Sequence, residues 1–264
     1  MNYHLDQKLA LVTGSTAGIG FAIAEALAGE GARVIINGRT DDRVAQAIKK
    51  IHAKHPTAKL EAFGGDLSQA DHVAEVYERF PEIDILVNNL GVYEPKTFDK
   101  ITDADWHAII ETNFFSGVRL SRVYLPIMLH HNWGRIIFIS SESAVQIPKE
   151  MIHYGVTKTM QIALARGLAE MTVGTGVTVN SVLPGPTRSE GVEGFITNMG
   201  KEQGKSPAQV EKEFFQTVRP SSLIQRFATN EEVANMVAYV ASPLSSATNG
   251  AALRVDGGVV KSIL

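Results

Sequence analysis

The stretch Thr13–Gly20, TGSTAGIG, places three glycines between a short apolar run and a segment of helical periodicity. The apolar run at 8–13 is rich in residues typical of a buried strand, and the helical pattern covers 18–29. A glycine-rich turn between a strand and a helix suits the pyrophosphate of a dinucleotide, which binds at the positive end of the helix. No Gly-Lys-Ser/Thr follows, so the stretch predicts a dinucleotide site and argues against a nucleoside triphosphatase loop.

The glycines of this stretch have separate predicted roles. Gly14 permits the tight turn, Gly18 a close approach of the backbone to phosphate, and Gly20 close packing of the helix. The spacing differs from the commoner G-x-G-x-x-G, and an ordinary glycine-rich turn is the alternative. The predicted cofactor contacts from this loop are Gly14, Ser15, Thr16, Gly18, Ile19 and Gly20.

Outside this stretch, apolar runs alternate with helical segments along the chain. The expected strands are 8–13, 33–37, 59–65, 83–89, 134–140, 177–183 and 252–256. The expected helices are 18–29, 41–54, 69–79, 103–130, 151–173, 207–217 and 230–241. Several runs are continuously apolar, as in parallel strands that are covered on both faces. We therefore expect an α/β fold, a doubly wound parallel sheet of about seven strands with helices on both faces (Rossmann), in a single domain over 1–264.

The composition limits the classes of function. The chain has 264 residues, 44% of them hydrophobic and 20% charged, which is typical of a globular protein with a substantial core. A net charge of −3 gives no electrostatic footprint for nucleic acid. The absence of cysteine excludes disulfides and thiolate metal sites, and the eight scattered histidines predict no metal site. No signal peptide or membrane-spanning run is evident, so we expect a soluble, cytoplasmic protein without nucleic-acid or membrane partners.

The second predicted strand ends in the sequence INGRT (36–40). In NAD-binding sheets an acidic residue at this strand end takes the 2′-hydroxyl of the adenosine ribose. Here Gly38 makes room and Arg39 offers a planar guanidinium for a 2′-phosphate, while the aspartates at 41–42 suit the start of the next helix. A solvated loop arginine is the alternative. The tip, Gly38, Arg39 and Thr40, favours NADP over NAD.

The sequence HYGVTK (153–158) places a phenol and an amine one helical turn apart. Residues four apart on a helix are neighbours, so Tyr154 and Lys158 share a face. An ammonium group favours the phenolate and lowers the pKa of a nearby phenol from its usual value of about 10. We therefore expect Tyr154 to act in general acid–base chemistry, the alternative being an ordinary aromatic residue beside a solvated lysine.

Further motifs follow in a fixed order over nearly the whole chain. They are TGSTAGIG, Asp66, NNLG (88–91), Asn113, Ser141, Tyr154-x3-Lys158 and PGPT (184–187). Seven motifs in this order are together far more specific than any one of them. The chain resembles the short-chain dehydrogenase/reductase family, of the single-domain Rossmann type that includes 3-oxoacyl reductases. The resemblance implies hydride transfer between NADP(H) and a small-molecule carbonyl or secondary alcohol.

The resemblance also implies a catalytic set. Tyr154 would exchange a proton with the substrate oxygen, Ser141 would hold that oxygen, and Lys158 would also bind the nicotinamide ribose. Asn113 would anchor a water that links Lys158 to solvent, unless it merely distorts its own helix through its amide. Ser140 and Ser143 compete with Ser141 for the hydroxyl role; spacing favours Ser141, and Ser143 suits a pocket wall.

The remaining cofactor contacts are also implied by the resemblance. Asp66 would bind near the adenine, although a turn residue before a helix is an equal alternative. Asn89 would support the adenosine-side ribose, and Thr187 would hold the nicotinamide carboxamide. The family usually has alanine where this chain has Leu90, so the leucine must find room beside the nucleotide. The full set is Asp66, Leu67, Asn89, Leu90, Gly91, Tyr154, Lys158, Pro184, Gly185 and Thr187.

The long connection 185–226 is the expected substrate lid, with Phe195 and Ser143 as pocket walls. From 190 to 226 it carries five basic and five acidic residues, so its charge names no substrate, and a carrier-bound 3-oxoacyl chain, a small ketone and a sugar all stay open. Surplus apolar residues on 103–130 and 151–173 indicate a subunit contact, and the resemblance adds a homotetramer or homodimer.

Three other functions are alternatives to this hypothesis. The same chemistry with NAD(H) and a catalytically silent dinucleotide-binding regulator stay as alternatives. A nucleotide-sugar epimerase or dehydratase fits the glycine spacing and the chain length poorly.

Overall fold

The computed structural model describes residues 2–263, and for residues 190, 191 and 195 it describes the backbone alone. Within this range seven parallel strands form one sheet in the order β3-β2-β1-β4-β5-β6-β7. The strands are β1 (Leu9–Val12), β2 (Arg33–Gly38), β3 (Lys59–Gly64), β4 (Ile85–Asn88), β5 (Gly134–Ile139), β6 (Val177–Pro184) and β7 (Ala252–Val255). The expected doubly wound α/β sheet is confirmed.

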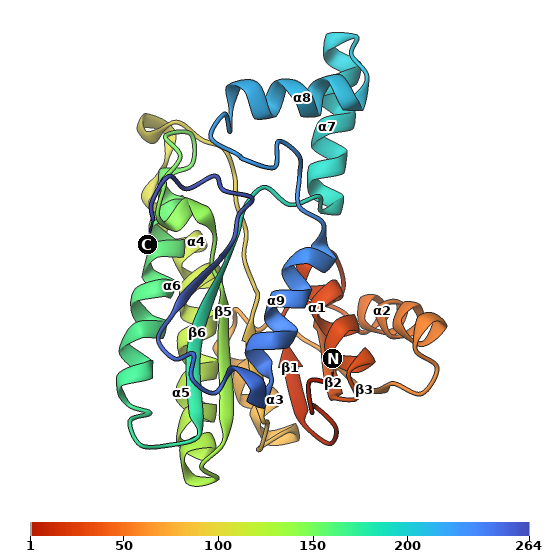
Figure 1. The fold of residues 1–264 in the computed structure, drawn as a ribbon, viewed down its shortest axis with the longest axis vertical. Helices are drawn as coiled ribbons and strands as arrows, with labels where there is room; N and C mark the ends of the chain where they lie inside the picture. The colour runs from red at the N-terminus through yellow and green to blue at the C-terminus, as the bar shows by residue number, and fades with distance from the viewer. Residues whose placement is uncertain (1, 264) are drawn as a thin grey trace.

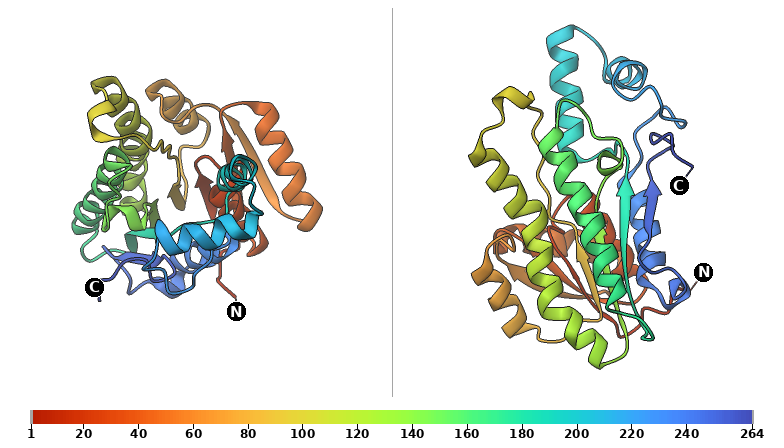
Figure 2. Two further views of the ribbon diagram at one scale, coloured as in Figure 1. Left: turned by 90° about the horizontal axis from the view of Figure 1, so that it is seen from above. Right: turned by 90° about the vertical axis from the view of Figure 1, so that its left-hand side faces the viewer.

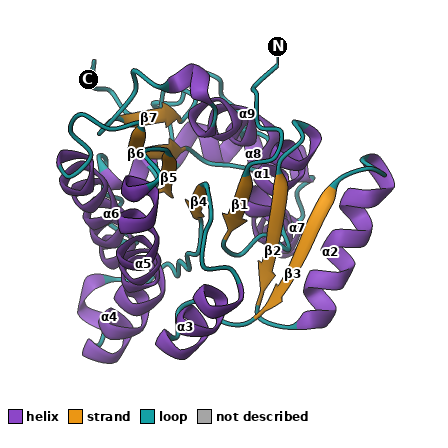
Figure 3. Ribbon diagram, turned by 90° about the horizontal axis from the view of Figure 1, so that it is seen from below, coloured by secondary structure: helices purple, strands orange, loops and turns teal. Residues whose placement is uncertain are grey.

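Helices cover both faces of this sheet (Figures 1–3). The first face carries α1 (Gly18–Gly29), α2 (Asp41–Lys54) and α9 (Asn230–Ala241). The opposite face carries α3 (Ala70–Arg79), α5 (Ser116–His130) and α6 (Ile152–Glu170), with α4 (Asp103–Ile110) leading into α5. Across residues 2–263, none of the helices combines the length and apolarity that crossing a bilayer requires.

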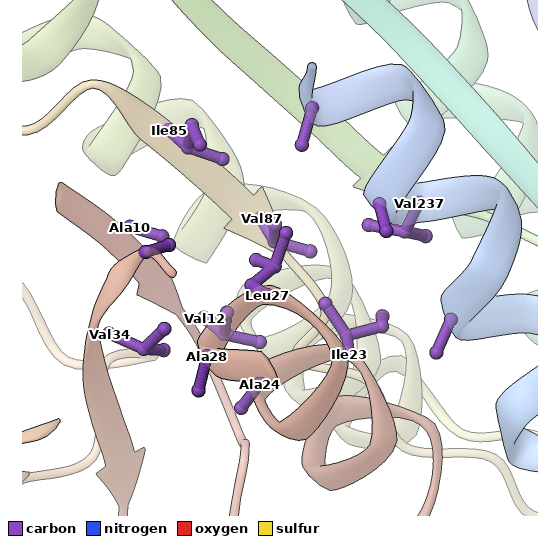
Figure 4. Close-up of a cluster of buried hydrophobic side chains, with 14 of the residues drawn as sticks. Ala10, Val12, Ile23, Ala24, Leu27, Ala28, Val34, Ile85, Val87 and Val237 are labelled. Carbon is purple, nitrogen blue, oxygen red and sulfur yellow. The ribbon is translucent and has the colours of Figure 1, made fainter. Parts of the chain in front are cut away.

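Successive strand residues supply the two sides of the core. Ala10 and Val12 of β1 pack with α1, and Figure 4 shows Ile23 and Leu27 of that helix between them and Val237 of α9. Leu11, which lies between them in sequence, packs in the cluster on the opposite face. Because side chains alternate across a strand and both faces are covered, β1 must be apolar throughout.

The predicted helix 103–130 is interrupted in the structure. Residues Glu111–Phe115 form a π-helical segment between α4 and α5. Such segments leave main-chain carbonyls without their usual helical partners and occur often at functional sites. This one contains Asn113.

The connection 185–226 contains more helix than the sequence predicts. In addition to the expected α8 (Pro207–Thr217), it forms α7 (Glu190–Gln203), and Ser189 caps the first turn by accepting a hydrogen bond from Val192 N at 3.4 Å. The helix ends at Gly204, whose φ of 66° is left-handed. These two helices share a small core of their own, made of Ile196, Val210, Phe215 and Phe227.

The sheet has a topological switch point between β1 and β4, because β1 pairs with β2 on one side and with β4 on the other. Ligands of open α/β sheets bind at such a point, beyond the carboxyl ends of the strands. Helices α7 and α8 lie at this end of the sheet, beyond the tip of β6 (Figures 1 and 2).

Candidate active site

The glycine loop lies at the switch point, between β1 and α1. Gly14 and Gly18 have left-handed φ angles of 61° and 57°. A Cβ on Gly20 would lie 2.4 Å from both Asn89 Nδ2 and Gly14 O, so the loop packs too closely there for any side chain. Because α1 begins at Gly18, its free amides face the space above the loop, and this cradle fits a pyrophosphate.

Asn37, at the end of β2, braces this loop. Its Oδ1 accepts a hydrogen bond from Gly14 N at 3.0 Å, and its Nδ2 donates to Phe63 O and Gly65 O at 3.2 and 3.0 Å. Asn37 is 1% exposed, so all of these hydrogen bonds of its side-chain amide lie inside the protein. This role was not predicted from the sequence, although an asparagine within an apolar strand is a signal for a buried hydrogen-bonding role.

A second brace comes from the end of β4. Thr13 Oγ1 accepts from Asn89 N and Leu90 N at 2.8 and 3.0 Å, and Asn89 Nδ2 donates to Thr13 O at 2.9 Å. The amide of Asn89 thus holds the glycine loop itself. The side chain of Leu90 packs against the hydrophobic core and beside Gly14. A Cβ added to Gly14 would lie 3.2 Å from Leu90 Cδ2.

The tip of β2, where the adenosine end of a dinucleotide is expected, meets the glycine loop. A Cβ on Gly38 would lie 2.4 Å from Thr16 Cγ2, so glycine is required where the two loops meet. Arg39 follows with an exposed side chain, which is free to reach a bound nucleotide. Thr40 caps α2 by accepting from Arg43 N at 3.5 Å.

Asp66 closes a turn before α3. Its Oδ1 accepts from Ser68 N and Ser68 Oγ at 3.0 and 2.8 Å, which is the geometry of the turn alternative. Leu67 is fully buried in the core, so only its main chain can face a nucleotide.

A cavity of about 350 Å³ joins the glycine loop to the ends of β4, β5 and β6. It brings together twelve of the predicted site residues: Gly14, Ile19, Gly20, Asn89, Leu90, Gly91, Ser141, Tyr154, Lys158, Pro184, Gly185 and Thr187. Its wall also includes six residues that were not singled out as cofactor or substrate contacts: Ala17, Tyr93, Ile139, Ser140, Ser189 and Val192. The glycine loop and the pair Tyr154 and Lys158 therefore line the same cavity.

Tyr154 and Lys158 lie on the same side of α6, with Lys158 Nζ 5.6 Å from the centre of the Tyr154 ring. Burial raises the pKa of the Tyr154 phenol; a hydrogen bond with Ser141 acts to lower it, and the charge of Glu142 adds to the rise. Burial lowers the pKa of Lys158 to about 7. Burial is the largest influence on the phenol in this structure, and it acts against the lowering of the Tyr154 pKa that is expected from Lys158.

Lys158 Nζ is held by two acceptors. It donates to Ile139 O at 2.8 Å and to Gln161 Oε1 at 3.3 Å. Gln161 Nε2 in turn donates to the main-chain carbonyl of Asn113 at 2.5 Å. The amide of Gln161 thus links the main-chain carbonyl of Asn113 to Lys158.

The side chain of Asn113 is fully engaged elsewhere. Its Oδ1 accepts from Val92 N at 2.8 Å, and its Nδ2 donates to Val92 O and Thr157 Oγ1 at 2.9 and 3.1 Å. Asn113 therefore fastens the loop after β4 to α6, and its main-chain carbonyl is what faces Lys158 through Gln161.

The competing serines have different surroundings. Ser140 and Ser141 both line the cavity, but the hydroxyl of Ser140 is engaged elsewhere, since its Oγ donates to Lys158 O at 2.8 Å and anchors β5 to α6. Ser143 is 2% exposed, donates to Glu142 and is not among the described residues that line the cavity. The side chain of Phe195 lies outside the described residues.

Glu142 and Arg219 are two further residues that the sequence analysis missed. Glu142 accepts a hydrogen bond from Ser141 Oγ at 2.5 Å, and Arg219 Nε lies 3.3 Å from its other oxygen. No spacing rule connects positions 77 apart in sequence, so the sequence held no signal for this pair. Within the part of the chain that the structure describes, no group of three or more histidine, aspartate or glutamate side chains is arranged to hold a metal ion.

Comparison with known proteins agrees with this geometry. Residues 8–200 match the model of the short chain dehydrogenase family. The uncharacterized oxidoreductase YvaG of Bacillus subtilis (strain 168) is 48% identical over the full length of both chains. The 3-oxoacyl-[acyl-carrier-protein] reductase FabG of Aquifex aeolicus (strain VF5) is 32% identical, over 98% of this chain and 100% of that protein.

A solved structure extends the likeness to the whole fold. The L-sorbose reductase of Gluconobacter frateurii, complexed with NADPH and L-sorbose, superposes with a TM-score of 0.93 at 29% identity and covers 100% of both chains. With the family model matching most of the chain, the conclusion is direct: this chain is an oxidoreductase of the short-chain dehydrogenase family.

Proposed function

We propose that this protein transfers a hydride between NADP(H) and a small-molecule carbonyl or secondary alcohol. The observation that carries the proposal is that Ser141, Tyr154 and Lys158 line one cavity with the glycine loop. A proton donor and a dinucleotide cradle must share a space for this reaction, since hydride and proton arrive at adjacent atoms.

The residues present would hold the dinucleotide along the switch-point crevice. The amides at the start of α1 would take the pyrophosphate, Lys158 the nicotinamide ribose and Thr187 the carboxamide. Asp66 and Asn89 would contact the adenosine half, and both also serve the turns described above. The bound nicotinamide supplies or accepts the hydride.

Tyr154 would supply the proton in carbonyl reduction. Its raised pKa keeps the phenol protonated at neutral pH, as a general acid requires. Lys158, with a pKa of about 7, can exchange protons at neutral pH and so return one toward the phenolate. Gln161 and the carbonyl of Asn113 orient this amine.

Arg39 supports NADP as the cofactor. Its exposed guanidinium follows Gly38 at the tip of β2, where an NAD-binding sheet would carry an acid. The NADPH in the L-sorbose reductase structure is consistent with this choice.

Segment 185–226 would act as the substrate lid. Ser189 and Val192, at the start of α7, already contribute to the cavity wall. We further propose a homotetramer or homodimer in the cytoplasm. Exposed apolar side chains such as Phe115 and Met171, 40% and 60% exposed, support a subunit contact.

The test is Tyr154→Phe. The variant should bind NADPH with unchanged affinity by fluorescence titration, while turnover of a panel of ketones, 3-oxoacyl thioesters and sugars falls by about 10²- to 10⁴-fold, because the proton donor is lost. Tyr77→Phe, an exposed tyrosine on α3, is the matched control and should keep wild-type turnover. Near-wild-type turnover in Tyr154→Phe would refute the proposed function.

A further inference from the structure

The polar side chains around the proposed proton donor bond mainly within the protein. Ser140 Oγ donates to the main-chain carbonyl of Lys158 at 2.8 Å, and Ser143 Oγ donates to Glu142 at 3.2 Å. The side-chain amide of Asn113 is likewise engaged by its neighbours. Little hydrogen-bonding capacity is left for the several hydroxyl groups of a sugar, and a substrate hydroxyl that loses water without gaining a partner weakens binding.

The buried charges of the same region are balanced as well. Arg219 lies 3.3 Å from Glu142 and 3.2 Å from Glu150, and its side chain is 12% exposed. Its guanidinium is therefore already neutralised by carboxylates of the protein. An anionic substrate would have to rely on an exposed cation such as Lys149, in the loop before α6.

Three chain segments meet beside Tyr154. Tyr93, in the loop after β4, lines the cavity and packs edge-on against the Tyr154 ring, with centroids 6.1 Å apart. A bond from Lys96 N to Glu150 O at 2.9 Å joins that loop to the loop before α6. Arg219 joins the segment after α8 to Glu150. A substrate whose carbonyl lies at Tyr154 therefore meets these three segments.

The three segments expose five large apolar side chains, each between 44% and 52% exposed. This apolar rim consists of Val92, Tyr93, Val145, Ile147 and Val218. Ile147 packs on the first turn of α6, because a Cβ added to Gly155 would lie 2.7 Å from Ile147 Cγ2. Exposed apolar side chains at the mouth of a cavity indicate a binding surface.

We propose that the substrate carries an alkyl or aryl group next to its carbonyl, that the apolar rim covers this group, and that Tyr93 is the main specificity-determining residue. The inference rests on the proposed function. In reduction, the hydride of the dinucleotide forms the C–H bond and the proton of Tyr154 forms the O–H bond. The apolar group takes no part in these changes, and its contribution is the surface that it removes from water.

The test uses carbonyl compounds that are bound but not reduced. Calorimetry measures the binding of straight-chain primary amides, from butanamide to octanamide, to the protein saturated with NADPH. We expect the affinity to rise about two- to fourfold per added methylene, since each buried methylene contributes a similar free energy. A ketohexose should bind more weakly than hexanamide. An affinity that does not depend on chain length, or tighter binding of the ketohexose, would overturn the inference.

Variants of Tyr93 assign the contact. Tyr93→Ser should weaken octanamide binding about tenfold and butanamide binding less than about threefold, because the longer chain reaches the ring. Tyr93→Phe should restore the octanamide affinity, since the ring and not the hydroxyl makes the contact. Val173→Ser removes an exposed apolar side chain beyond the far end of α6 and should leave both affinities unchanged. Equal losses in Tyr93→Ser and Tyr93→Phe would overturn the inference.

Two other occupants of this region give different results. Hexanoate that binds more tightly than hexanamide, with the difference lost in Lys149→Ala, would show an anionic substrate and overturn the inference. Ile147→Ser should flatten the dependence on chain length. If it instead lowers the molecular mass in sedimentation and keeps that dependence, the rim contacts a second copy of the chain and the inference is wrong. Turnover of ketones in Tyr154→Phe would refute the proposed function, whereas the amide series reports on the rim alone.

Discussion

Arg39 is the residue on which cofactor choice depends in our proposal. Arg39→Ala should weaken NADPH binding by about 10- to 100-fold and change NADH binding by less than about threefold, because only the 2′-phosphate loses a charged donor. Fluorescence titration with both nucleotides measures this. Arg33→Ala, at the other end of β2 and paired with Glu61, is the control and should leave both affinities unchanged. Equal wild-type affinities, or tighter binding of NADH, would contradict the role of Arg39.

Lys158 should make the stability of the free protein depend on pH. Its folded pKa of about 7 lies below the ordinary value of 10.5, so between these values the unfolded chain binds the extra proton. Stability therefore rises with pH across this window, by up to about 1.4 kcal/mol per pH unit from this group. Urea unfolding between pH 7 and 9.5 should show this rise in the wild type but not in Lys158→Met.

The control for this experiment is Lys212→Met on α8, an exposed lysine in the same protein. It should keep the wild-type slope of stability against pH. The same slope in Lys158→Met would show that burial of Lys158 does not govern the titration.

Single residues differ in how far the sequence reveals them. Tyr154 and Lys158 could be paired from sequence because helix geometry fixes neighbours four apart. The direction of the pKa of Tyr154 could not, because it depends on burial. Glu142 and Asn37 were missed for a related reason: their hydrogen-bond partners lie on other elements, and the sequence carries no rule for those distances.

At the scale of elements, the π-helical segment Glu111–Phe115 gives a testable contact. Gln161→Met keeps the side-chain volume but leaves the carbonyl of Asn113 without its donor. We expect the free energy of unfolding in urea to fall by about 1–3 kcal/mol, the cost of an unsatisfied buried acceptor. Gln146→Met, an exposed position, should have little effect. A loss no larger than that of the control would show that the bond contributes nothing to stability.

The elements themselves were predictable where one physical rule dominates. The seven strands were found because strands covered on both faces must be apolar. Helix α7 was not predicted within the connection 185–226; in the structure the cap at Ser189 and the small core around Phe215 stabilise it. The π segment was missed because it differs from an α-helix only in hydrogen-bond spacing, i to i+5 instead of i to i+4, and over five residues this hardly alters the apolar pattern.

At the scale of the molecule, Arg219 holds the α7–α8 segment, residues 188–227, to the loop after β5 through its ion pair with Glu142. Arg219→Met leaves Glu142 buried without a counter-ion and should lower the free energy of unfolding by about 3–5 kcal/mol. Limited proteolysis should also cut within 188–227 faster, because the segment loses its anchor. Arg226→Met, which breaks the surface pair with Glu232, is the control and should change both much less. Equal effects of the two variants would show that the segment is held elsewhere.

The base of the α7–α8 segment is closed by main-chain bonds, from Ala228 N to Pro186 O at 2.9 Å and from Arg188 N to Ala228 O at 2.8 Å. The chain therefore leaves β6 and enters α9 at adjacent points, so the segment is an insert whose two ends are joined to each other. Doubling the length of such an insert costs only about 0.6 kcal/mol in closure entropy. Inserts of different length from relatives should therefore be tolerated at this position. The graft must carry its own partner for Glu142: an insert without an arginine equivalent to Arg219 would leave the buried Glu142 of the host without a counter-ion.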